Sequence, residues 1–278
     1  MNAYATGLPL DPATRSLYPP PMALANLSFF GRSIGVTTGL TVILPDAGPG
    51  PFPVFYLLHG LGDDHTIWAR RTSIERYVSG LPLIVVMPDT ARGWYTNSAT
   101  TPGALYEDHL IKDVIPFVDR LFPTIARREG RVIGGLSMGG YGAVKLALKF
   151  PDLFCSATSH SGAVMTPLYK PETRPKDFQP MATEFEAIFG SSWRGGSNDP
   201  TALATKCPIH LRPALRIDCG TNDFLLDQNR EFHACLDSLH FPHEYEEFPG
   251  EHNWAYWDIH VQDAIRFHCR VLKIPTGA

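Results

Sequence analysis

Two runs of consecutive apolar residues constrain the fold of this chain most strongly. They read Val-Phe-Tyr-Leu-Leu at 54–58 and Leu-Ile-Val-Val-Met at 83–87. A run without polar interruption is typical of a strand that is covered on both faces, because a strand with one face in water alternates between apolar and polar residues. A stretch with helical spacing, 72–78, lies between the two runs. Buried strands joined by helices pair in parallel, so the runs predict a mostly parallel sheet with helices on both faces.

The same alternation continues along the chain. Two strands at 27–34 and 40–44 precede the first run, and a turn rich in proline and glycine at 46–53 follows them, which suggests a hairpin at the sheet edge. The later expected strands are 131–133, 153–159, 214–219 and 244–248. The later expected helices are 105–122 with a kink at Pro116, 140–150, 224–239 and 253–268.

The length of 278 residues fits one large α/β domain. We expect residues 1–25, which are rich in proline and lack periodicity, to form an extended arm, and residues 26–278 to form the domain. At about 163–205 the alternation of strands and helices is interrupted. Here a predicted loop at 166–180 is followed by short helical segments at 182–189 and 200–205. Such an insertion forms either a small cap over a pocket or a surface excursion without a role.

Composition excludes several classes of partner. The net charge of −4 argues against nucleic acid and anionic membrane surfaces. No run approaches the length of a membrane span, and residues 1–10 lack the pattern of a signal peptide, so we expect a cytoplasmic protein. The five scattered cysteines are interpreted as reduced thiols, and neither they nor the histidines show metal spacing, so we expect no metal. The sequence does not set the oligomeric state, and a homo-oligomer stays open as an alternative to a monomer.

Residues 135–139 read Gly-Leu-Ser-Met-Gly, a G-x-S-x-G motif. The motif lies between the expected strand 131–133 and the expected helix 140–150. This is the setting of a nucleophile elbow, a sharp turn that lifts the hydroxyl of Ser137 above the sheet. Glycines on either side let strand and helix approach each other closely. The alternative is a glycine-rich loop with an idle serine.

A serine hydroxyl needs a histidine to take its proton and an acid to orient that histidine. Around a nucleophile elbow these partners follow later in the chain, the acid first, from loops at the carboxyl ends of strands. Asp223 lies in such a loop after the strand 214–219, whereas Asp218 lies inside that strand and Asp227 inside the next helix. The alternative role of Asp223 is to cap the helix that follows it.

His252 lies between the last expected strand and the last expected helix, where the histidine of such a site belongs. His240 and His243 come before or on the strand, and His260 falls in the middle of the helix. We therefore expect His252 to be the base.

The oxyanion of an acyl-transfer reaction needs two backbone amides. One belongs to the residue after the nucleophile, Met138, and the other to a loop after an earlier strand. The residues His-Gly-Leu-Gly at 59–62 end the run 54–58, so Leu61 is the expected second donor; the alternative is an ordinary glycine turn.

Two further groups of residues were considered. Glu246, Glu247 and Glu251 could form a pair of glycosidase carboxylates, but their position beside a strand favours solvated charges. The second group consists of aromatic residues that are candidates to line an acyl or aromatic pocket or to pack in the core: Trp94, Tyr95, Trp254 and Trp257. Trp94 and Trp254 are the preferred pocket candidates, because their loops flank the expected site.

Five segments together resemble one known family. They read HGLGDDHTIW at 59–68, RGWYTN at 92–97, GLSMGGYGA at 135–143, CGTNDFLLDQNREF at 219–232 and PGEHNWAYW at 249–257. Over roughly residues 26–270 the chain is similar to the α/β-hydrolase esterases that include tributyrin esterases, S-formylglutathione hydrolases, feruloyl esterases and mycolyltransferases. The resemblance implies the α/β-hydrolase fold, a triad of Ser137, Asp223 and His252, and oxyanion amides at Leu61 and Met138.

The resemblance also implies an activity: hydrolysis of short-chain acyl esters of small molecules through an acyl-enzyme, without metal or cofactor. Three alternatives stay open: a feruloyl or acetyl xylan esterase, an S-formylglutathione hydrolase, and, further away, an acyltransferase or a binding module without catalysis. S-formylglutathione hydrolases typically carry Ser-Gly-Leu-Thr-Cys where this chain has His-Gly-Leu-Gly-Asp at 59–63. This departure disfavours that substrate.

Overall fold

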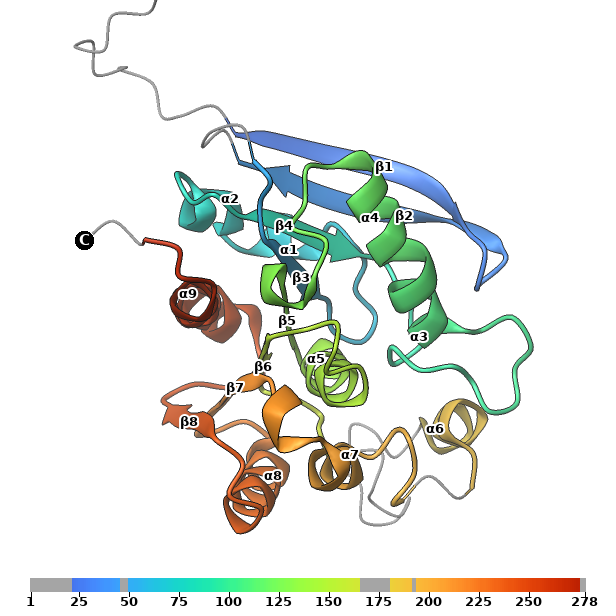
Figure 1. Ribbon diagram of the computed structural model, residues 1–278. Coiled ribbons are helices and arrows are strands. Elements are labelled where there is room, and N and C mark those ends of the chain that lie inside the picture. Colours follow the sequence, from blue (N-terminus) through green and yellow to red (C-terminus); the bar gives the residue numbers. More distant parts are fainter. Residues whose placement is uncertain (1–21, 46–49, 166–180, 192–193, 276–278) are drawn as a thin grey trace, which may run out of the picture.

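The computed structural model describes residues 22–45, 50–165, 181–191 and 194–275 (Figure 1). The strands of these ranges form one eight-stranded sheet with the order β1-β2-β4-β3-β5-β6-β7-β8. Their bounds are β1 Ala23–Gly31, β2 Val36–Leu44, β3 Val54–Leu58, β4 Ile84–Pro88, β5 Arg131–Leu136, β6 Ser156–His160, β7 Ala214–Gly220 and β8 His243–Phe248. β2 is antiparallel to both of its neighbours, and all pairs from β4 to β8 are parallel. This is the α/β-hydrolase fold, as predicted.

The helices follow the strands in alternation. The α-helices are α1 Ile67–Arg71, α2 Ile74–Val78, α3 Tyr106–Asp108, α4 Ile115–Leu121, α5 Met138–Lys149, α6 Ala182–Phe189, α7 Pro200–Lys206, α8 Leu226–Ser238 and α9 Trp254–Leu272. Short 3₁₀ turns occur at Arg128–Gly130 and Ile209–Leu211, and a π-helical turn occurs at His109–Val114. Within the described ranges, no helix combines the length and the apolar character that a membrane crossing requires.

Burial of the central strands on both faces explains the apolar runs. In β3, Val54, Tyr56 and Leu58 belong to one core cluster, while Phe55 and Leu57 belong to the other. The first cluster is completed by residues of α4, α5 and α8, and the second by residues of α1, α2 and α9. Figure 1 shows α5 and α9 on opposite sides of the sheet. Successive side chains of a strand point to opposite faces, so a strand covered twice must be apolar throughout.

Several boundaries differ from the predicted ones. Residues 23–25, expected in the arm, are the first three of β1 and pair with β2, while residues 1–21 lie outside the described residues. The expected helix 72–78 corresponds to α2, and α1 precedes it in a stretch for which the sequence predicted no element. The expected helix 105–122 consists of α3, the π-helical turn and α4. Its change of helix type coincides with Pro116, the second residue of α4, because proline has no N–H to continue the ladder.

The insertion is described in part. The expected helical pieces correspond to α6 and α7, and residues 166–180 lie outside the described residues. Phe185 and Phe189 of α6 pack against Trp94, with ring centroids 4.9 and 5.9 Å apart. The described part of the insertion is therefore anchored on the α5 side of the sheet.

Candidate active site

Ser137 occupies the sharp turn between β5 and α5. Its φ of 52° and ψ of −115° lie in a region that a residue with a side chain rarely adopts, at a typical cost of about 1–3 kcal/mol. The flanking glycines make the turn possible: a Cβ added at Gly139 would lie 2.5 Å from the carbonyl oxygen of Leu58, and one at Gly135 would lie 2.7 Å from the same atom. The G-x-S-x-G motif is thus explained by close contact between the turn and the end of β3.

The backbone of Ser137 is fixed by the neighbouring strand β6 and the segment after it. Its N–H donates to the carbonyl of His160 over 3.0 Å, and its own carbonyl accepts the N–H of Ala163 over 3.0 Å. These bonds satisfy backbone groups that the strained turn removes from the ladder. The hydroxyl is therefore presented on a rigid support.

The structure brings Ser137, His252 and Asp223 together. Nε2 of His252 lies 3.1 Å from Oγ of Ser137, and Nδ1 of His252 lies 2.9 Å from Oδ2 and 3.1 Å from Oδ1 of Asp223. The three residues follow the carboxyl ends of β5, β8 and β7. A proton on Nδ1 that is donated to Asp223 leaves Nε2 free to accept the serine proton. This is the arrangement that general-base activation of a serine requires.

The Asp223 carboxylate binds His252 and does not cap the following helix. α8 begins at Leu226, two residues later than expected, its N-cap position is Leu225, and no side chain among the described residues caps it. The Asp223 side chain is fully buried, and Oδ1 accepts the N–H of Leu225 over 2.8 Å in addition to its contact with His252. This local bond orients the carboxylate toward the imidazole, because one carboxylate has enough acceptor positions for both contacts.

Aromatic rings hold the imidazole of His252 in place. The ring of Phe224 lies 4.5 Å from it, and the ring of Trp257 meets it edge-on at 4.9 Å. Only 17% of the His252 side chain is exposed. Restricted rotation of the ring keeps Nε2 aimed at the hydroxyl.

The loop after β3, which carries Leu61, is tethered at His59. The hydroxyl of Tyr95 donates to the His59 carbonyl over 2.9 Å, and the N–H of Thr90 donates to Nε2 of His59 over 3.1 Å. Burial lowers the pKa of His59, which keeps the ring neutral. Met138 is the first residue of the 12-residue helix α5, where backbone N–H groups have no partner inside the helix. Both predicted oxyanion donors thus belong to segments that border Ser137.

A cavity of about 380 Å³ opens onto the serine. It is lined by Gly60, Leu61, Asp63, Leu136, Ser137, Phe224, His252, Asn253, Trp254 and Trp257. Trp254 lies where it was predicted. For Trp94 the other role that the sequence left open holds: it is fully buried and packs against Tyr141 and Phe185 in the core, away from the pocket.

Phe224 and Asp63 line the pocket although no sequence pattern assigned them to it. Phe224 follows Asp223 directly, so proximity to an assigned residue was a usable signal. Trp257, a candidate from the sequence, lies one turn after Trp254 and lines the pocket. Asp63 belongs to the same loop as Leu61. Burial raises the pKa of Asp63, with a second contribution from the neighbouring Asp64. This carboxyl group gives the pocket a polar wall beside the oxyanion loop.

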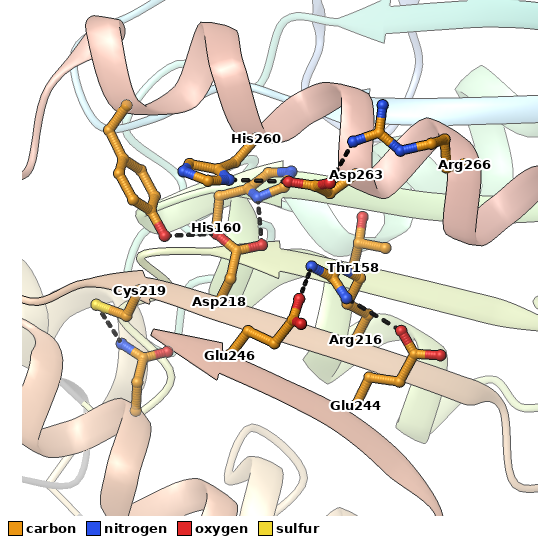
Figure 2. A network of polar contacts seen from close by, with 12 residues as sticks. Thr158, His160, Arg216, Asp218, Cys219, Glu244, Glu246, His260, Asp263 and Arg266 are labelled. Carbon is orange, nitrogen blue, oxygen red and sulfur yellow. Dashed lines mark hydrogen bonds and ion pairs between the residues drawn. The ribbon is translucent and has the colours of Figure 1, made fainter. Parts of the chain in front are cut away.

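The rejected candidates serve other purposes. Figure 2 shows His160 beside Asp218, with Nδ1 and Oδ2 2.8 Å apart, and the hydroxyl of Tyr256 donates to the other Asp218 oxygen over 3.0 Å. His260 pairs with Asp263 over 2.9 Å. Glu246, Glu247 and Glu251 do not form a pair of glycosidase carboxylates. Glu246 binds Arg216, Glu247 binds Arg230, and Glu251 is exposed.

Of the remaining rejected residues, Asp227 lies in α8, as expected, and His240 is exposed at the turn after that helix. His243 begins β8, where it contacts His233. None of these three lines the cavity at Ser137.

The chain is similar to known esterases and serine hydrolases. A family described as putative esterases matches residues 31–268. An acetyl esterase of Caldicellulosiruptor saccharolyticus is 27% identical over 90% of this chain and 99% of its own length. FphF, a fluorophosphonate-binding serine hydrolase of Staphylococcus aureus, is 35% identical with a TM-score of 0.79 over 89% of this chain and 98% of its own. An S-formylglutathione hydrolase, FrmB, from the same organism is 35% identical with a TM-score of 0.76 over 89% and 99%.

Proposed function

The chain belongs to the esterase family, and we propose that it is a serine carboxylesterase that hydrolyses short-chain acyl esters through an acyl-enzyme intermediate. One observation carries the proposal: a continuous hydrogen-bonded chain runs from Oγ of Ser137 through His252 to the buried carboxylate of Asp223, beside an open cavity. The roles of the single residues follow from this chain of contacts.

In the first half-reaction, Oγ of Ser137 attacks the ester carbonyl while Nε2 of His252 takes its proton. Asp223 holds the imidazole in the productive tautomer and stabilises its positive charge. The N–H groups of Leu61 and Met138 bind the oxyanion of the tetrahedral intermediate. When this intermediate collapses, His252 gives the proton to the departing alkoxide, and the acyl group stays on Ser137.

In the second half-reaction, His252 removes a proton from water, which attacks the acyl carbonyl. The second tetrahedral intermediate uses the same two amides, and its collapse returns the proton to Ser137 and releases the carboxylic acid. Every bond that forms or breaks in this scheme involves only Ser137, the ester and water, and His252 carries each proton, so the scheme requires neither a metal nor a cofactor. Treatment with a chelator is expected to leave the initial rate at low temperature unchanged.

The pocket favours small, uncharged esters. Its volume of about 380 Å³ is at the lower end of the range for small-molecule sites, about 300–1,000 Å³. Its walls are mainly apolar, with Leu61, Phe224, Trp254 and Trp257 among them, and the polar Asp63 is an acid. Among the described residues that line it there is neither lysine nor arginine, which a site for a carboxylate-bearing alcohol or thiol would use.

S-formylglutathione hydrolysis is the second candidate, because FrmB of Staphylococcus aureus is 35% identical to this chain. Two features rank it below simple esters. Glutathione carries carboxylates, which Asp63 would repel, and the loop at 59–63 differs from the one that is typical of these hydrolases. The similarity to an acetyl esterase supports the first candidate.

A substrate panel separates the candidates. We expect kcat/KM to be highest for p-nitrophenyl acetate to butyrate and to fall at least about tenfold by decanoate, because longer chains exceed the pocket. Methyl ferulate, acetylated xylan and S-formylglutathione complete the panel, and added alcohols test acyl transfer. A strong preference for S-formylglutathione would replace the first candidate with the second. Acyl products that form with alcohol in place of acid would indicate a transferase.

A further inference from the structure

A cluster of three potential metal ligands lies at the end of β8 that is remote from His252. His233 and Asp237 are one turn apart on α8, and His243 is the first residue of β8. One ligand atom from each lies within 4.8 Å of the other two. We propose that this α8–β8 cluster, His233, Asp237 and His243, binds a divalent transition ion of the zinc class. The proposal is independent of the esterase function.

His243 is oriented as a metal-binding histidine usually is. Its side chain is only 4% exposed, and its Nδ1 lies 2.7 Å from the carbonyl oxygen of Phe241. Because the carbonyl can only accept, the proton is on Nδ1 and the lone pair is on Nε2. An N–H bound to a backbone carbonyl is the usual support of a histidine ligand, since it fixes the tautomer and the plane of the ring. Nε2 points toward His233, and the two ring nitrogens are 2.7 Å apart.

The ring of His233 is also held in position. It stacks on the ring of Tyr245, with centroids 4.2 Å apart and planes at 8°. The Tyr245 hydroxyl donates to Glu247 over 2.9 Å, and Glu247 is paired with Arg230 over 2.7 Å. These contacts hold the Tyr245 ring, on which the His233 ring stacks, in a fixed position. The imidazole therefore needs little further ordering to bind an ion.

Asp237 completes the donor set. Its carboxylate oxygens lie 3.5 Å from Nε2 of His233 and 4.0 Å from Nε2 of His243, and its side chain is 64% exposed. Two imidazoles and one carboxylate, with water as the fourth ligand, form a common tetrahedral zinc site, in which ligand atoms are about 3.3 Å apart. The His233 ring is partly exposed and the Asp237 side chain is largely exposed, so small side-chain rotations can bring the three ligand atoms to the spacing of a zinc site. Nitrogen donors favour zinc over calcium or magnesium.

Such an ion would join the end of α8 to the start of β8, the edge strand of the sheet. The turn at 239–242 connects the two elements, and the ion would close it. Five residue steps of β8, about 17 Å, separate His243 from Phe248 at the other end of the strand. The expected effect of the ion is therefore on thermal stability, with ester hydrolysis unchanged.

Zinc titration of the whole chain tests the proposal. After treatment with a chelator and dialysis, isothermal titration with ZnCl₂ is expected to show one saturable equivalent. His233→Ala and His243→Ala should each weaken it by at least about tenfold, as expected when a metal site loses a supporting imidazole. His240→Asn is the matched control, because His240 is exposed, lies close by and has a left-handed φ of 47° that asparagine tolerates. It should bind like the wild type.

Two further readouts complete the test. Zinc should raise Tm in the wild type and in His240→Asn but leave it unchanged in His233→Ala, and Co²⁺ should give the visible spectrum of a tetrahedral site. If His243→Ala fails to fold, His233→Ala and Asp237→Asn decide. No saturable binding by the wild type, or undiminished binding in both His233→Ala and Asp237→Asn, would mean that the cluster is a hydrogen-bonded histidine pair and would overturn the proposal.

Discussion

Two serine–histidine contacts in the described part of the chain differ in almost everything except distance. Oγ of Ser137 lies 3.1 Å from Nε2 of His252, and Oγ of Ser156 lies 2.8 Å from Nδ1 of His268. The first pair borders a cavity and includes a carboxylate. The second pair is sealed in the core, and its other ring nitrogen contacts the hydroxyl of Thr158 over 3.1 Å. A short contact between serine and histidine is therefore not sufficient evidence of a nucleophile.

The difference lies in what surrounds each imidazole. Burial, with a smaller contribution from His160, lowers the pKa of His268 to about 3, so this ring stays neutral and cannot serve as a base near neutral pH. His252 instead donates to Asp223, which stabilises the charged form that appears during catalysis. Ser137 also occupies a strained turn, whereas Ser156 is the first residue of β6. Access, a carboxylate partner and a strained turn together distinguish the two sites.

The largest expected effect comes from removing each hydroxyl in turn. Ser137→Ala should reduce kcat for p-nitrophenyl butyrate by about 10⁶-fold, because no acyl-enzyme can form. Ser156→Ala should change kcat by no more than a few-fold, although it leaves Nδ1 of His268 without its hydrogen-bond partner and lowers stability. Steady-state assays of both variants, with circular dichroism as a check on folding, compare them. Equal losses would contradict the distinction between the two sites.

Asp223 and Asp218, which each bind a histidine, provide the next comparison. Asp223→Asn should lower kcat by about 10⁴-fold, because the amide favours the wrong tautomer of His252. Asp218 binds His160 and Tyr256 away from the cavity, so Asp218→Asn should lower kcat far less. The measurement is kcat at saturating substrate for both variants. If the loss were greater in Asp218→Asn, Asp223 would be the wrong acid.

The smallest effect concerns pH and stability. Between the folded pKa of His268, about 3, and its unfolded value of 6.5, the unfolded chain binds a proton that the native state excludes. The neutral His268 ring therefore makes its full contribution to the free energy of unfolding above pH 6.5. As the pH falls through this window, the free energy of unfolding decreases by up to about 1.4 kcal/mol per pH unit. Urea unfolding at pH 7, 6 and 5 measures this effect. The free energy of unfolding should decrease more steeply with falling pH in the wild type than in His268→Gln.

The exposed His210→Gln serves as the control for that experiment, and its pH slope should equal that of the wild type. A His268→Gln slope that is indistinguishable from the wild type would show that the buried ring does not resist protonation. Such a result would remove one of the differences between the two serine–histidine contacts.

Much of the fold could be predicted because its signals are local. The apolar runs at 54–58 and 83–87 indicate strands that are covered on both faces. Gly135 and Gly139, on either side of Ser137, indicate the sharp turn between strand and helix. The loop positions of Asp223 and His252 also follow from strand order, because parallel strands end at one edge. The roles of these residues stay predictions until the variants are measured.

The missed features depend on contacts between distant parts of the chain. Trp94 is buried because Tyr141 and Phe185 surround it, and no residue near Trp94 in sequence indicates this. The contact of Ser156 with His268 joins residues that are 112 positions apart. His233 and His243 meet only because α8 and β8 lie next to each other, so their spacing resembles no sequence motif for metal binding. Packing decides these details, and local patterns do not record it.

Covalent labelling tests the central claim most directly. An organophosphate such as paraoxon phosphorylates a serine only where a base and an oxyanion site activate it. We predict one adduct per chain, located by peptide mass spectrometry on Ser137, absent in Ser137→Ala and strongly slowed in His252→Ala. An adduct on Ser156 or another serine, or an unmodified Ser137 in protein that hydrolyses esters, would contradict the account.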